Sequence, residues 1–196
     1  MKELFYATHS KNKQNTMKER LKDLNIEVHF PDFDPNIAES GKNEIENAII
    51  KATTFVNQVN IPILAGDSGL YFKDTNIESP GLVVRVSRNK PLTDSELVGH
   101  YQNLAKQNNG KITAYYKTGL ALIVDGKIHT TEIIEPEFYI LDKPCPNKHP
   151  DSPHSLAFSK KQNKYFNEMT PKEFSEEDKI FRQQLINFLK TWIDIK

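Results

Sequence analysis

The chain has 196 residues, with 26 lysines and arginines balanced by 26 acidic residues, so its formal net charge at neutral pH is zero. This balance excludes a bulk electrostatic field that would draw the protein to nucleic acid or to a membrane, so any polyanion it binds must be small and held by a local group of cations. We expect residues 1–196 to form a single domain of two lobes, in the cytoplasm, because no apolar run approaches membrane-spanning length and Cys145 is the only cysteine.

The first third of the chain alternates short apolar runs with amphipathic segments. Residues 4–8 predict a first strand, residues 9–24 turn into a helix, and residues 26–30 predict a second strand. After a loop rich in proline and aspartate, the capping pattern of Asn43 and Glu46 indicates the start of a helix that extends to about residue 57.

The stretch IPILAGDSGL, residues 61–70, is the centre of the predicted sheet. Its apolar run, bounded by Pro62 and Gly66, predicts a buried strand that ends in a tight loop containing Asp67 and Ser68. Ligands of open α/β sheets bind beyond the carboxyl ends of strands, which places Asp67 well for chemistry. The alternative is an Asx turn, in which this carboxylate only bonds its own loop backbone.

The second half of the chain is richer in β structure. Residues 93–108 predict a helix with a second capping box, residues 112–125 and 128–141 predict a long β-hairpin closed by an Asp-Gly turn, and residues 175–195 predict a last helix. This order predicts an α/β fold of two lobes, with a mixed central sheet flanked by helices, an attached antiparallel β lobe and a cleft between them.

Polar residues near two helix starts suit phosphate and metal binding. The first strand–helix junction carries Thr8, Ser10 and Lys13, and a helix N-terminus offers N–H groups to phosphate; the alternative is that its lysines are ordinary surface charges. Glu39 precedes the second helix, and with Asp67 it would be enough for Mg²⁺, which takes few carboxylates together with water and substrate oxygens. The alternative for Glu39 is a solvated loop glutamate.

Three polar residues, Glu44, Asn47 and Lys51, lie on one flank of the helix that begins near residue 43. We expect this flank to be neither buried nor opposite the core, a position that suits site residues but is also common for solvated ones. The helix start, through its dipole, explains Glu44 and Glu46.

The ordered segments ATHSKNK, ESG…ENAIIKA, LAGDSGL and SPGLVVR, over roughly the first 90 residues, resemble the inosine/xanthosine triphosphate pyrophosphatase family. That family typically shows T-x-N-x-x-K, a glutamate before a glycine, E-N-A-x-x-K-A, D-D-S-G-L, and P-G followed by a basic residue. The resemblance implies a two-lobed, usually homodimeric α/β enzyme that cleaves a non-canonical purine nucleoside triphosphate to monophosphate and pyrophosphate with Mg²⁺, or alternatively Mn²⁺.

The resemblance also implies roles for individual residues. Asp67 matches the catalytic carboxylate, which is also a metal ligand, and Glu39 matches the other metal ligand. The residues that match substrate contacts are Thr8, Ser10 and Lys13 in the phosphate loop, Lys51 on the following helix, Ser68 after the carboxylate, and Arg85 after Pro-Gly.

The sequence departs from the family pattern at both ends of the site. Gly66 stands where the first aspartate of D-D-S-G-L is expected, and Ser10 stands where asparagine is usual. Farther along, the family's F-G-Y-D-P-x-F loop has no close counterpart, and the Ser-His-Arg that grips the purine edge is absent. Arg182 is the candidate cation for the base, although an ion pair with Asp178 one turn earlier explains it equally well.

The leading hypothesis is a Mg²⁺-dependent nucleoside triphosphate pyrophosphohydrolase acting on ITP, XTP or dITP. Asp67 would orient the nucleophile, and Lys13, Lys51 and Arg85 would neutralise the leaving pyrophosphate. One alternative is the same reaction on a pyrimidine or modified nucleotide, and another is a nucleotide-binding protein with impaired catalysis. We expect a homodimer that binds a nucleoside triphosphate and neither nucleic acid nor membrane.

Overall fold

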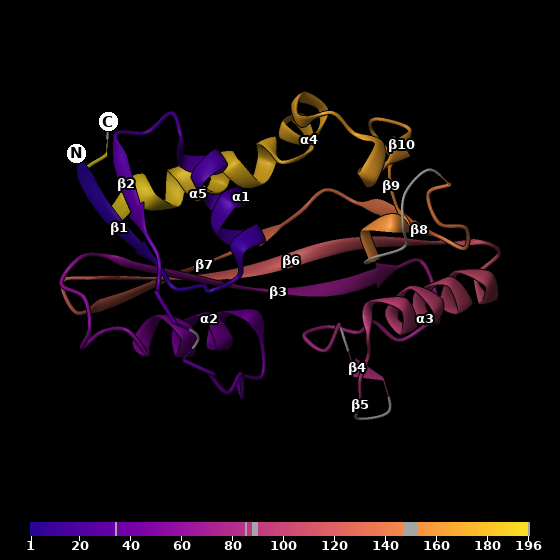
Figure 1. Ribbon diagram of the computed structural model, residues 1–196, viewed down its shortest axis with the longest axis horizontal. Helices are drawn as coiled ribbons and strands as arrows, with labels where there is room; N and C mark the ends of the chain where they lie inside the picture. The colour runs from indigo at the N-terminus through magenta and orange to yellow at the C-terminus, as the bar shows by residue number, and fades with distance from the viewer. Residues whose placement is uncertain (34, 85, 88–89, 147–152, 196) are drawn as a thin grey trace. The chain divides into compact units, whose positions relative to one another are not determined.

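The structure is a computed structural model that describes residues 1–33, 35–84, 86–87, 90–146 and 153–195 (Figure 1). The chain divides into two compact units. The first unit comprises Met1–Ser68, Lys117–Ile133 and Ile180–Lys196, and the second comprises Gly69–Tyr116 and Ile134–Lys179. Strands β3 (Ile63–Lys73) and β6 (Lys111–Val124) contribute residues to both units.

The first unit is a sheet with helices on both faces (Figure 1). Its strands follow the order β6-β3-β1-β2, with β7 paired to β6, and β1 is parallel to both of its neighbours. Besides β3 and β6, it contains β1 (Lys2–Tyr6), α1 (Lys11–Leu21), β2 (Ile26–His29), α2 (Glu44–Thr53), β7 (Lys127–Ile134) and α5 (Lys179–Trp192).

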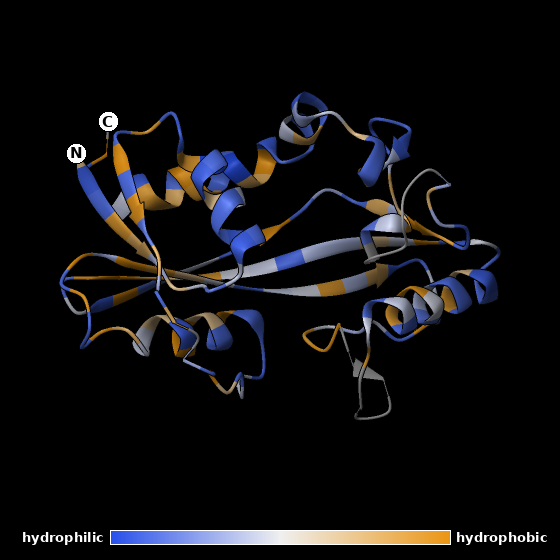
Figure 2. Cartoon of the chain, in the orientation of Figure 1, coloured by the Kyte–Doolittle hydropathy of each residue, from blue (hydrophilic) through white to orange (hydrophobic). Residues whose placement is uncertain are grey.

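Alternation along the strands divides the core of this unit into two layers. On β1, Leu4 and Tyr6 pack with α1 and α5, whereas Phe5 packs with α2. On β3, Leu64 belongs to the first layer and Ala65 to the second. Figure 2 shows the corresponding apolar bands on β1, β2 and α5. The same alternation, continued along β3, sets which layer each site residue faces.

The second unit is built on antiparallel pairs: β6 with β8, β8 with β9, and β9 with β10. Helix α3 packs on this part of the sheet through Leu97, Tyr101 and Ala105, and its predicted capping box, Thr93 with Glu96, is confirmed. Besides β3 and β6, the unit contains β4 (Val86–Ser87), β5 (Lys90–Pro91), α3 (Asp94–Gln107), β8 (Phe138–Leu141), η1 (Pro153–Ser155), β9 (Ala157–Ser159), β10 (Lys164–Tyr165), η2 (Phe166–Glu168) and α4 (Pro171–Glu177).

The predicted fold class, a mixed α/β sheet flanked by helices with an antiparallel part, is confirmed. Among the described residues, no helix combines the length and the apolar composition that crossing a membrane requires.

Three predicted elements differ from the observed ones. Strand β3 does not end at Gly66 but continues to Lys73, because β6 pairs with it beyond that point. The second hairpin strand is two strands, β7 and β8, separated by a break that contains Pro136, which cannot donate a ladder hydrogen bond. The last helix is also two helices, because Thr170 caps an earlier helix, α4, that ends before Asp178.

Candidate functional site

Asp67 lies within strand β3, and its side chain faces helix α2. Its Oδ1 is 2.6 Å from the Lys51 Nζ, and its Oδ2 accepts a hydrogen bond of 3.0 Å from the Asn47 Nδ2. The two partners lie one helical turn apart on α2, so both reach the same carboxylate. Asp67 is therefore fixed by helix side chains across the sheet face, and it is not the cap of an Asx turn.

Lys51 joins Asp67 to the loop before α2. Its ammonium is also 2.9 Å from the Glu39 Oε1, so the two carboxylates converge on one positive charge. The side chains of Lys51 and Asp67 are only 11% and 9% exposed, whereas that of Glu39 is 47% exposed. The carboxylates that sequence reasoning named as metal ligands thus meet at the same cation.

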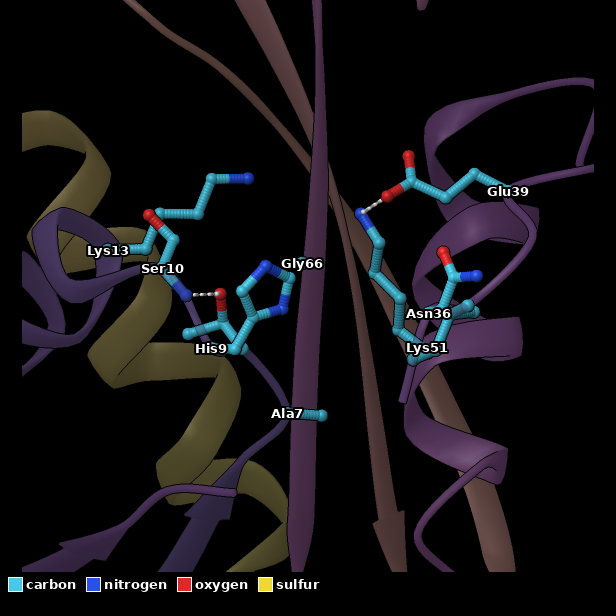
Figure 3. A pocket seen from close by; sticks show the side chains of 10 residues that line it. Ala7, His9, Ser10, Lys13, Asn36, Glu39, Lys51 and Gly66 are labelled. Atoms are coloured by element: carbon cyan, nitrogen blue, oxygen red, sulfur yellow. Dashed lines mark hydrogen bonds and ion pairs between the residues drawn. The ribbon is translucent and has the colours of Figure 1, made fainter. Parts of the chain in front are cut away.

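A pocket of about 310 Å³ opens beside this group of charges. Figure 3 shows Ser10 and Lys13 on one side of the strand that carries Gly66, with Glu39 and Lys51 on the other side. The lining residues are Ala7, Thr8, His9, Ser10, Lys13, Asn36, Ile37, Glu39, Lys51 and Gly66. The structure therefore brings five of the predicted site residues to one pocket, with Asp67 directly behind Lys51.

The phosphate-loop candidates occupy the start of helix α1. Ser10 is the N-cap residue in an extended conformation, and its side chain makes no capping hydrogen bond. The buried Gln14 holds the loop from below by donating a 2.9 Å hydrogen bond to the Thr8 carbonyl. The first turn of α1 carries no acidic residue, so its N–H groups and positive dipole end favour an anion in the pocket.

Lys13 adds a second cation to the pocket from this helix. Loss of solvation around its ammonium, reinforced by the nearby Lys51 charge, lowers the pKa of Lys13 below its usual 10.5, while Asp67 and Glu39 oppose that shift. A bound anion would relieve the repulsion between the two ammonium groups. The pocket therefore presents the ammonium groups of Lys13 and Lys51 to an anion such as a phosphate chain, with the carboxylates of Glu39 and Asp67 beside them.

Gly66 stands where the family pattern has an aspartate, at a position where a side chain would be in close contact with its neighbours. A Cβ at this position would lie 3.1 Å from the Leu120 Cδ2 and 3.6 Å from the Tyr6 hydroxyl. Burial raises the pKa of Tyr6 to about 12, so this phenol keeps its proton at neutral pH. Position 66 thus contributes neither charge nor bulk to the pocket.

Two of the predicted substrate contacts in the described part of the chain, Ser68 and Arg182, are not among the residues that line this pocket. Ser68 points to the opposite face from Asp67, and its Oγ is 2.7 Å from the Thr118 Oγ1. Arg182 donates a hydrogen bond of 2.9 Å to the Arg20 carbonyl and forms an ion pair with Asp23 at the end of α1, in place of the expected pair with Asp178. Arg85 lies outside the described residues.

The expectation that the flank of α2 is not buried was wrong. Glu44, Asn47 and Lys51 are only 0%, 2% and 9% exposed. The reason is Gly119 on β6, where a Cβ would lie 2.4 Å from the Ile45 N, so the helix start packs directly on the strand. Glu44 is enclosed there, with its Oε2 3.3 Å from the Lys117 Nζ, and is not a solvated helix-start residue.

Asn47 is a site residue to which sequence reasoning assigned no role, although it placed Asn47 on the same flank as Lys51. The available signal was its position one turn before Lys51, on the same side of the helix. Asn43 does cap α2 by accepting from the Glu46 N–H, as predicted, and the Glu46 carboxylate accepts from the Lys42 backbone N–H and from the Asn43 Nδ2.

The sequence of the chain is similar to those of known proteins. The model of the Ham1 family matches residues 4–177. A dITP/XTP pyrophosphatase from Borrelia duttonii is 34% identical over 140 residues, which cover 67% of this chain and 68% of that protein. One from Coxiella burnetii is 37% identical over 100 residues, so the match spans 50% of each chain.

Solved structures support the fold over nearly the whole chain. A HAM1 protein from Coxiella burnetii superposes with a TM-score of 0.75 and 23% identity, covering 97% of this chain and 100% of the other. The Staphylococcus aureus Ham1 protein superposes with a TM-score of 0.72 and 20% identity, covering 97% and 99%. The family match spans both units and includes every residue that lines the pocket, and the chain therefore belongs to the Ham1 family.

Proposed function

We propose that the protein hydrolyses a nucleoside triphosphate to the monophosphate and pyrophosphate. The observation that carries this proposal is the pocket in which the start of α1 and Lys13 lie opposite the Glu39–Lys51–Asp67 group. Such a pocket offers N–H groups and positive charge to phosphate oxygens, and a fixed carboxylate to a nucleophilic water. The activity stated in the names of the two pyrophosphatase relatives agrees with this chemistry.

The proposed roles of the site residues follow from their charge and hydrogen-bonding groups. Thr8, Ser10 and the N–H groups of α1 bind the phosphate chain, and Lys13 and Lys51 neutralise the negative charge that grows on the departing pyrophosphate. Asp67 orients a water molecule toward the α-phosphorus and accepts its proton as the bond to the bridging oxygen breaks. Asn47 and Lys51 hold that carboxylate in one orientation, so little reorganisation is needed during the reaction.

The proposal includes Mg²⁺, with Mn²⁺ as the alternative. Glu39 and Asp67 fit this role, because two carboxylates that already converge on one ammonium present the hard oxygen donors that these cations prefer. When bound, the ion would supply positive charge to the phosphates and lower the pKa of a bound water.

The proposed substrates are ITP, XTP and dITP, and the name dITP/XTP pyrophosphatase carried by the relatives supports dITP and XTP. The proposal also includes a cytoplasmic homodimer. Sedimentation velocity at micromolar concentration tests the assembly, and cell fractionation tests the location.

Pyrophosphate release from a panel of nucleotides tests the activity. We expect inosine and xanthosine triphosphates to be turned over with an efficiency at least about tenfold above that for ATP, GTP, UTP and CTP, a modest discrimination for a binding pocket. Asp67→Asn should lower kcat by about 10² to 10⁴-fold, the usual contribution of a general base. A folded protein that turns over none of these nucleotides with Mg²⁺ or Mn²⁺ contradicts the proposal. Preference for a pyrimidine would keep the reaction and reassign the base.

A further inference from the structure

Asn47 connects the Asp67 carboxylate to the backbone of the loop that carries Glu39, through hydrogen bonds at both ends of its amide. Its Nδ2 donates to the Asp67 Oδ2 at 3.0 Å, and its Oδ1 accepts from the backbone N–H of Gly41 at 2.8 Å. Gly41 follows Glu39 by two residues. A single side chain therefore joins the strand that carries Asp67 to the loop that carries Glu39.

The connection closes a ring of contacts. Lys51 joins Asp67 to Glu39 on the open side, and Asn47 joins Asp67 to the Glu39 loop on the buried side. Asn47 is 2% exposed, and because its donor and acceptor ends are both used, the amide has one orientation. The lysine contact joins charged side chains, whereas the amide contact bonds the backbone of the loop.

The loop that carries Glu39 lies in close contact with Asn47 at Gly41. A Cβ at Gly41 would lie 2.6 Å from the Asn47 Oδ1 and 2.7 Å from the Asn47 backbone N. Any larger residue at position 41 must move the loop away from α2, and the Glu39 side chain moves with it. The hydrogen bond between this loop and Asn47 therefore depends on glycine at position 41.

The chemistry of Asn47 differs from that of its neighbours on the helix. Ala48 and Ala52 fill the apolar layer between α2 and the sheet, as packing alone would require. An apolar side chain at position 47 would fill the same volume but leave the Gly41 N–H and one Asp67 oxygen without these bonds. A buried polar group that satisfies two partners specifies geometry more than it adds stability.

We propose that Asn47 is a positioning residue that sets the separation of the Glu39 and Asp67 carboxylates, and thereby the affinity of the site for a divalent cation. This inference rests on the proposed function, in which those carboxylates hold the metal. Partners that orient metal ligands are typically worth about 10 to 100-fold in metal affinity when removed.

Mn²⁺ binding without nucleotide, measured by electron paramagnetic resonance and by calorimetry, tests the proposal. We compare the unaltered protein with Asn47→Ala, with Gly41→Ala and with the double variant. Asn47→Ala removes both bonds of the amide, and Gly41→Ala displaces the loop while leaving the bond to Asp67. Phe55→Leu is the matched control, because Phe55 is a fully buried residue of the same apolar layer and contacts no site residue through a polar atom.

The expected result is a Kd for Mn²⁺ that rises about 10 to 100-fold in each single variant and rises no further in the double variant, since both break the same connection. The affinity for tripolyphosphate in EDTA should stay within about twofold, because the phosphate loop is untouched, and Phe55→Leu should change neither value. Circular dichroism and thermal unfolding in EDTA establish that each variant is folded.

Two outcomes overturn different claims. If the unaltered protein binds Mn²⁺ and a folded Asn47→Ala or Gly41→Ala binds it equally well, the positioning role is wrong and the proposed function stands. If the unaltered protein binds no Mn²⁺, the metal site of the proposed function fails, and the role of Asn47 fails with it. If the losses of Mn²⁺ affinity in the two single variants add up in the double variant, the claim that both substitutions break the same connection is wrong.

Discussion

The ion pair between Lys51 and Asp67 should behave as a buried pair and contribute strongly to folding. The two side chains are 11% and 9% exposed and their charged atoms are 2.6 Å apart. Removing one partner of such a pair costs about 3 to 5 kcal/mol, because the other charge stays in a poorly solvated place. Asp67 keeps its bond from Asn47, so we take the lower end, about 3 kcal/mol for Lys51→Met. That loss lowers the folding equilibrium constant by roughly a hundredfold.

A double-mutant cycle isolates the interaction from the rest of each side chain. Urea unfolding in EDTA, followed by circular dichroism, gives the free energy of unfolding for Lys51→Met, Asp67→Asn and the double variant. We expect a coupling of at least about 1.5 kcal/mol. The Lys22–Glu19 pair on α1 is the control, because its contact is 3.0 Å but its side chains are 57% and 74% exposed, so its coupling should stay below about 0.5 kcal/mol. Equal couplings for the two pairs would refute the reasoning.

Three further predictions follow from single residues. Reduced solvation and the Lys51 charge lower the pKa of Lys13, so the affinity for tripolyphosphate should begin to fall at pH values below 10.5 as Lys13 loses its proton. Lys13→Arg should move this fall to higher pH in calorimetric titrations, and an unchanged pH profile contradicts the role of Lys13. The Gly66→Asp variant should fold, because the atom nearest to a Cβ at position 66 is the end of the Leu120 side chain. The new carboxylate should weaken tripolyphosphate binding without metal several-fold through charge repulsion, and an unfolded protein or tighter binding argues against the placement of position 66. Lys117→Met should lower the free energy of unfolding, measured by urea denaturation, by about 3 kcal/mol, because Glu44 is fully buried beside that lysine. Adding Glu44→Gln to the same chain should restore part of the loss, and a loss near zero in Lys117→Met contradicts this prediction.

Local patterns in the sequence predicted most of the elements that carry the site. Helix α2 could be predicted because a capping residue and a run of apolar side chains at helical spacing reinforce one another. The phosphate-loop residues could be placed at the start of α1 because a strand, a polar junction and a helix follow in order. Each of these signals depends only on neighbours along the chain.

The environment of Asp67 could not be predicted in this way. Glycines at 66 and 69 resemble a loop, yet β6 pairs with this segment and extends the strand to Lys73. The strand then turns Asp67 toward α2 and Ser68 toward Thr118, a division that a loop would not impose.

The sequence by itself determined which groups the site contains: the acids, the lysines and the helix start that suits an anion. Tertiary structure alone decided which of them meet. Gly119 lets α2 approach the sheet, and this approach buries Asn47 and Lys51 against Asp67. Tertiary structure also decided that Arg182 donates a hydrogen bond to the Arg20 carbonyl on α1. Burial and pairing depend on segments far apart in the chain, and no local pattern specifies the distance between them.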